Sequence, residues 1–136
     1  MSLHVLIAVR DATVLEYYRV FLAWEGHTVE TAKTGISCMA RMRSEVPDLL
    51  VLDSDLLWGG EAGVLAGMRE DPDLAAVPVM VLTNRPEDGD IACADYPPIR
   101  AYLPKPLSPQ GLGRAIRQLA AAPREPATAA SASWFG

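Results

Sequence analysis

Cysteine and long hydrophobic runs are both scarce in this sequence. Its two cysteines, Cys38 and Cys93, have no second cysteine or histidine at the spacing of a metal site. A disulfide and a zinc site therefore lack support, and we expect both side chains to behave as small, buried or half-buried apolar groups. The apolar stretch near the N-terminus, HVLIAV, is interrupted by Arg10 and Asp11, and is too short for a signal peptide or a membrane span. We expect a cytoplasmic protein.

Basic residues are also fewer than acidic ones. The chain has 12 lysines and arginines against 17 acidic residues, which gives a formal net charge of −5. A domain of this charge is a poor binder of nucleic acid or of an anionic membrane. The sequence also lacks an internal repeat and a glycine-rich phosphate fingerprint of the GxGxxG or P-loop type. These absences favour a protein or a small molecule as partner.

The sequence does contain a regular alternation of apolar runs and amphipathic stretches. Its 136 residues are enough for one domain with a single core. The runs predict strands at 4–9, 28–32, 48–53, 77–83 and 99–104, and the amphipathic stretches predict helices at 12–26, 35–47, around 64–69 and at 108–121. Continuous apolar strands separated by helices indicate an α/β fold, a (βα)5 doubly wound five-stranded parallel sheet with right-handed crossovers.

The last residues differ in composition from the rest. Residues 122–136 are rich in alanine, serine and proline, which is typical of a linker or a disordered tail. Trp134 and Phe135 are unusual in such a segment, and could dock on another surface. We expect the domain to span residues 3–121.

Polar residues follow three of the predicted strands. Asp53 closes the run LLVLD, Thr83 closes VPVMVLT, and Lys105 follows AYLP. The carboxyl ends of parallel strands meet at one edge of a sheet, which is where such folds bind their ligands. A single aspartate in this position is more often a turn former. Three polar strand ends, separated by 30 and 22 residues, predict a site.

The segments PDLLVLDSD, PVMVLT and AYLPKP resemble the signature of the receiver domain of two-component response regulators. The resemblance covers residues 4–121 and implies the flavodoxin-like strand order 2-1-3-4-5. It implies a signalling module and no enzyme in the ordinary sense, with weak self-phosphorylation and dephosphorylation only. Its partners would be a histidine kinase or phosphotransfer protein, and an output domain on the C-terminal side.

The resemblance also implies a role for each matching residue. Asp53 would be the phosphoacceptor, because an aspartate carboxylate can attack phosphorus and become an acyl phosphate. Thr83 and Lys105 would bind the phosphoryl group. Tyr102 would be the switch aromatic, although a half-exposed strand aromatic can also serve packing alone. Pro106 would follow a cis peptide bond.

The sequence departs from the family at the acidic pair that holds Mg²⁺. Val9 and Arg10 stand there, and neither supplies the oxygen ligands that Mg²⁺ requires. Three interpretations remain open. Asp11 could become a metal ligand with Asp53 and the backbone of Asp55. Arg10 could form an ion pair with Asp53 or Asp55 and replace the metal. Arg10 could instead lie along the surface and only reduce the repulsion between the acids.

Two further segments depart from the family. Leu56 and Leu57 replace a Met-Pro pair and are followed by Trp58. The helix expected within 86–98 is restricted to a couple of turns by Gly89 and the pair Pro97–Pro98. The surface that carries output and dimer contacts in the family is therefore expected to be remodelled.

Two alternatives stand beside a phosphorylated receiver. The first is a pseudo-receiver, a protein-interaction module that keeps the fold without phosphoryl transfer. The second is a flavodoxin-like binder of small molecules, which the sequence disfavours because no loop is suited to a phosphate or a flavin.

Overall fold

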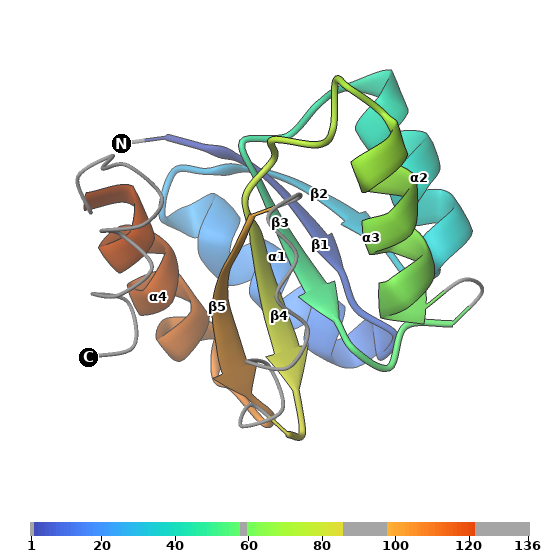
Figure 1. Cartoon of the computed structure of the whole chain (residues 1–136). Coiled ribbons are helices and arrows are strands. Elements are labelled where there is room, and N and C mark those ends of the chain that lie inside the picture. The colour runs from blue at the N-terminus through green and yellow to red at the C-terminus, as the bar shows by residue number, and fades with distance from the viewer. Residues whose placement is uncertain (1, 58–59, 86–97, 122–136) are drawn as a thin grey trace.

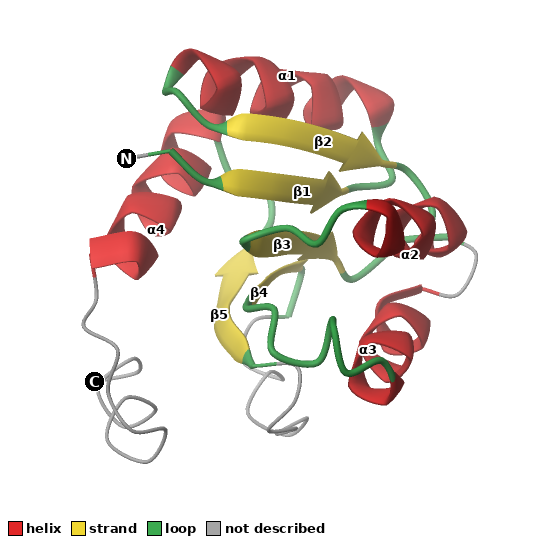
Figure 2. Ribbon diagram, turned by 90° about the horizontal axis from the view of Figure 1, so that it is seen from above, coloured by secondary structure: helices red, strands yellow, loops and turns green. Residues whose placement is uncertain are grey.

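A five-stranded parallel sheet lies between two pairs of helices (Figures 1 and 2). The computed structural model describes residues 2–57, 60–85 and 98–121. The elements, in chain order, are β1 (His4–Ala8), α1 (Ala12–Trp24), β2 (Thr28–Ala32), α2 (Gly35–Ser44), β3 (Leu49–Asp53), α3 (Gly60–Glu70), β4 (Val79–Thr83), β5 (Ile99–Pro104) and α4 (Pro109–Ala121). The strand order is β2-β1-β3-β4-β5, which confirms the expected fold class and order.

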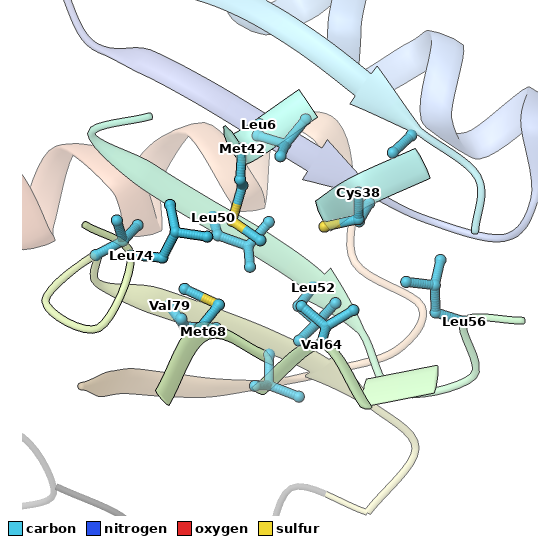
Figure 3. Close-up of a cluster of buried hydrophobic side chains, with 14 residues drawn as sticks. Leu6, Cys38, Met42, Leu50, Leu52, Leu56, Val64, Met68, Leu74 and Val79 are labelled. Carbon is cyan, nitrogen blue, oxygen red and sulfur yellow. The ribbon is translucent and has the colours of Figure 1, made fainter. Parts of the chain in front are cut away.

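Each face of the sheet has its own core. On one face, β-strand side chains pack against α2 and α3, as Figure 3 shows for Leu6, Met42, Leu50 and Met68. On the other face, alternate residues of the same strands pack against α1 and α4. Every residue of β3 is buried, as expected for a central strand of a parallel sheet.

Cys38 lies within the α2 and α3 core. Its side chain is fully buried, and burial raises the pKa of the thiol to about 12. Cys38 is therefore the small apolar residue that the sequence predicts. Cys93 lies outside the described residues.

Local signals set most of the helix boundaries. Asp11 caps α1, and Gly26 ends the turn after it with a φ of 101°, a conformation that glycine adopts without strain. A capping box of Thr34 and Ser37 begins α2. The amide of Gly111 donates to Ser108 Oγ (2.9 Å), as expected for Ser108 at the start of α4.

Several boundaries differ from the sequence prediction, and two of them lie close to prolines. α2 ends at Ser44 and not near residue 47: Glu45 is already extended (φ −152°), and Val46, which directly precedes Pro47, is disfavoured in the helical conformation. β4 begins at Val79 and not at residue 77, because Pro78 has no amide to donate to a ladder. The helix expected within 86–98, Trp58 and the segment 122–136 lie outside the described residues. No helix in the described part of the chain combines the length and the apolar composition that crossing a bilayer requires.

Two helical glycines give a matched test of the packing between α4 and α1. A Cβ added at Gly113 would lie 2.6 Å from Glu25 Oε1 and 2.8 Å from Phe21 Cε2, whereas one added at Gly63 would meet nothing within 4 Å. We expect Gly113→Ala to lower the free energy of unfolding by about 1 kcal/mol, because overpacking outweighs the gain in helix propensity. Gly63→Ala should raise it by roughly 0.5–1 kcal/mol. Urea denaturation measures both, and equal gains would contradict the close contact.

Candidate functional site

The sheet brings the three predicted polar residues to one edge. Asp53 ends β3, Thr83 ends β4, and Lys105 directly follows β5. The register places Asp53 opposite Leu82, and the amide of Lys105 donates to the carbonyl of Thr83 (2.9 Å). The arrowheads in Figure 1 mark this carboxyl edge of the sheet.

The carboxylate of Asp53 is buried and fully engaged. The residue is 4% exposed. Its Oδ1 accepts from Lys105 Nζ (2.7 Å) and from the amide of Asp55 (3.0 Å), while Oδ2 accepts from the amide of Arg10 (3.3 Å). Three donors therefore offset the cost of placing this charge in the interior.

Lys105 links two carboxylates. Its Nζ lies 2.7 Å from Asp53 Oδ1 and 2.8 Å from Asp55 Oδ2. Burial opposes the charge of Lys105, but its hydrogen bonds to both acids together outweigh burial and raise its pKa. The hydrogen bond from Lys105 lowers the pKa of Asp55, and its charge and that of Arg10 act in the same direction. Sequence reasoning considered Asp55 as a backbone metal ligand or as an ion-pair partner of Arg10, and it missed the side-chain contact with Lys105.

In the structure, the side chain of Asp11 is not directed to the metal position, and the side chain of Arg10 does not form an ion pair with Asp53. Asp11 Oδ1 accepts from the amides of Thr13 (2.9 Å) and Val14 (3.2 Å), so its carboxylate caps α1. Arg10 is exposed, touches Asp53 through its backbone amide, and acts on Asp55 through its charge. This arrangement agrees best with an arginine that only reduces repulsion among the acids.

The residues present do not fit the usual magnesium pocket. Receiver domains generally bind Mg²⁺ at an acidic pocket. Here Val9 is a buried alkyl group, and Lys105 already contacts Asp53. Within the described residues, the carboxylates of Asp11, Asp53 and Asp55 do not gather within 4.8 Å of one another. A cation with octahedral oxygen ligands therefore lacks its donor set in this arrangement.

Glu61 is a site residue that sequence reasoning missed. It lies in the first turn of α3. Burial raises its pKa, and the negative charges of Asp53 and Asp55 raise it further. The available signal was an acid near the start of the helix that follows the strand ending at Asp53.

The remaining expected residues lie on β4, on β5 and directly after Lys105. Thr83 Oγ1 accepts from the amide of Arg85 (3.0 Å), and Tyr102 is half-buried against the α2 and α3 core. The peptide bond between Lys105 and Pro106 is cis, in agreement with the expectation.

Tyr18 is a second residue near the site that sequence reasoning missed. Its hydroxyl donates to the carbonyl of Leu107 (2.6 Å). This bond ties α1 to the segment that carries Lys105. Burial raises the pKa of Tyr18, and the charge of Asp53 raises it further.

Comparisons with known proteins agree with this geometry. The chain is 31% identical to the response regulator MprA of Mycobacterium ulcerans, over 88% of this chain and 50% of MprA. It is 28% identical to protein PilH of Pseudomonas aeruginosa, over 85% of this chain and 97% of PilH. The chemotaxis response regulator CheY4 of Vibrio cholerae has the same fold, with a TM-score of 0.75 at 18% identity over 88% of this chain and 99% of that one. No family model matches the chain.

The chain resembles response regulators in sequence and has the fold of a receiver domain, and it departs from that family at the acidic pair. Such domains are signalling modules and not conventional enzymes. The chain spans 50% of the length of MprA, so its relatives of this kind are longer proteins.

The negative charges around Glu61 should make its ionised form destabilise the fold. Because its pKa is raised in the folded state, ionised Glu61 opposes folding above its ordinary value of 4.5, and this penalty disappears below that pH. Glu61→Gln should therefore raise the free energy of unfolding at pH 7.5, by about 0.5 kcal/mol after solvent screening, and the gain should vanish near pH 3.5. Urea denaturation at both values measures the difference.

Glu16→Gln is the matched control. Glu16 is exposed, and its hydrogen bond with Arg19 lowers its pKa, so its ionised form favours folding. The control should be neutral or slightly destabilising at pH 7.5. A loss of stability in Glu61→Gln at that pH would contradict the crowding of acids at this edge.

Proposed function

We propose that this domain receives a phosphoryl group on Asp53 and passes the signal to a partner or an output domain. The single observation that carries the proposal is the contact of 2.7 Å between Lys105 Nζ and Asp53 Oδ1 at the carboxyl edge of the sheet. An isolated buried aspartate would suggest a structural role. A buried aspartate that shares its edge with a lysine and a threonine supports phosphoryl chemistry.

The transfer begins with Asp53 as nucleophile. One carboxylate oxygen attacks the phosphorus of a phosphohistidine or of a small phosphodonor such as acetyl phosphate. The new O–P bond forms while the bond from phosphorus to the donor breaks, and the donor leaves with the electron pair. The product is an acyl phosphate on Asp53.

Lys105 supplies the positive charge. Its raised pKa keeps the ammonium ionised at neutral pH. The ammonium can therefore contact the Asp53 carboxylate before transfer and the negatively charged phosphoryl oxygens after it. Thr83 offers a hydroxyl at the neighbouring strand end. Tyr102, three residues before Lys105, is the side chain that we expect to change position when the hydroxyl engages the phosphoryl group.

The magnesium dependence should be weak. Asp11 is committed to the α1 cap, and Val9 and Arg10 replace the acidic pair. A domain of this kind would accept phosphate slowly and would depend on a histidine kinase or phosphotransfer protein for speed. The greater length of MprA supports an output domain beyond the receiver.

A phosphorylation-independent pseudo-receiver is the second candidate. It is favoured by the complete engagement of Asp53, whose two oxygens already accept from Lys105, Asp55 and Arg10. Under this alternative, the Asp53–Lys105 pair only fastens the sheet edge. The surface would then bind its partner in one fixed state.

Intact-mass spectrometry after incubation with acetyl phosphate separates the two candidates. The unmodified chain and the control Asp73→Asn, which changes an exposed aspartate, should each gain one phosphoryl group. Asp53→Asn should gain none, because the amide is no nucleophile. Each incubation is run with and without Mg²⁺, and circular dichroism verifies the folding of each variant.

The outcomes are distinct. If the unmodified chain gains no phosphoryl mass while the same acetyl phosphate modifies a known receiver domain, the result would contradict phosphorylation and support the pseudo-receiver. A gain that persists in Asp53→Asn would place the acceptor elsewhere. A gain that requires Mg²⁺ would contradict the proposed replacement of metal charge by Lys105.

A further inference from the structure

A second cluster of ionisable side chains lies at the other edge of the sheet. His4 begins β1, Glu30 lies in β2, and Glu45 follows the last residue of α2. His4 Nε2 is 3.2 Å from Glu30 Oε1, and His4 Nδ1 is 3.6 Å from Glu45 Oε2. β1 begins at His4 whereas its parallel neighbour β3 ends at Asp53, so His4 and Asp53 lie at opposite ends of the strands.

The imidazole of His4 is held in place. The amide of His4 donates to Asp48 Oδ2 (2.8 Å), and the amide of Asp48 donates to the carbonyl of His4 (2.7 Å). The side chain of His4 is 14% exposed. Because alternate residues of a strand share a face, the ring lies on the same side as Leu6, which is the side that α2 covers.

The two carboxylates cannot both be satisfied by a neutral ring. A neutral imidazole has one N–H and one lone pair, so one of the two glutamates must face a lone pair. The distance of 3.6 Å to Glu45 is also too long for a hydrogen bond. Either a second proton or a metal cation would remove this repulsion.

The surroundings favour a cation with more than one positive charge. Glu45 lies at the C-terminus of α2, where the helix dipole is negative, and Asp48 is close by. Arg41 contacts the other oxygen of Glu30 (3.5 Å), so Oε1 still faces His4. Arg43 lies 3.8 Å from Asp71 and is directed away from the cluster.

We propose that His4, Glu30 and Glu45 bind a divalent transition-metal cation of the Zn²⁺ class. The ligand atoms all lie within 4.8 Å of one another. The 3.2 Å between His4 Nε2 and Glu30 Oε1 is the span of two bonds of about 2.1 Å that meet at roughly 100°. Glu45 Oε2 faces the other ring nitrogen, Nδ1, so the Glu45 side chain, which is 67% exposed, would have to turn to reach an ion bound at Nε2. One imidazole with two carboxylates suits Zn²⁺ better than Mg²⁺, which prefers oxygen ligands alone.

Such an ion would join three segments that are far apart in sequence. It would fasten the starts of β1 and β2 to the end of α2. Because α2 packs on the face that also holds Tyr102, metal at this site would stiffen one side of the domain without touching Asp53.

Isothermal titration calorimetry with ZnCl₂ tests the site on the full chain without a polyhistidine tag. We expect one Zn²⁺ per chain, and a loss of affinity of about tenfold or more in His4→Asn and in Glu45→Gln, since even outer-shell partners cost that much. Glu16→Gln, which changes an exposed glutamate outside the cluster, should bind Zn²⁺ as the unmodified chain does. Mg²⁺ in excess should not compete.

Nuclear magnetic resonance of the ring nitrogens supplies a readout for this histidine. Addition of Zn²⁺ should shift one nitrogen of His4 and leave His27 unchanged, because His27 is buried and accepts from the amide of Leu3. Absence of Zn²⁺ binding, or His4 ring nitrogens that do not respond to Zn²⁺, would overturn the proposal. Binding that His4→Asn leaves unchanged would overturn it as well.

Discussion

The ion pair between Asp53 and Lys105 constrains the functional half of this domain. A carboxylate that is almost fully buried needs a partner, because an unpaired charge in the interior costs several kcal/mol, about 3–5 when one member of a buried pair is removed. The partner here comes from the far end of the chain, 52 residues away in sequence. It reaches Asp53 because β3, β4 and β5 are adjacent and parallel. The pair therefore depends on the correct sheet and in turn fixes its carboxyl edge.

The direction of the acidic side chains determines the rest of that edge. In a metal-binding pocket, carboxylates point toward a shared cation. Here the carboxylate of Asp11 instead accepts two amides at the start of α1, an N-cap interaction that contributes about 1 kcal/mol to stability. Lys105 and the backbone amides of Arg10 and Asp55 donate hydrogen bonds to the buried carboxylate of Asp53, which would contact the cation in a metal-binding pocket. The fold consequently remains intact although the acidic pair is missing.

Most of the architecture could be predicted because it follows from short-range patterns. The all-apolar run that ends at Asp53 predicts a central strand, and Ser108 followed by proline predicts the start of the last helix. Among the boundaries that differ, the end of α2 and the start of β4 lie close to Pro47 and Pro78. Each proline restricts the backbone next to it, and the apolar pattern does not resolve shifts of two or three residues. Glu61 could not be assigned to the site, because the position of α3 over the strand end is set by packing between the layers.

The sequence by itself determined the sheet, its strand order by resemblance, and the placement of Asp53, Thr83 and Lys105 at one edge. These features depend on the periodicity of apolar residues and on where each strand stops. Only the tertiary structure decided where the charged side chains point: Asp11 toward its own helix, and Lys105 toward two acids. The physical reason is that the partner of a charged side chain is set by distances between segments remote in sequence, which local pattern does not encode.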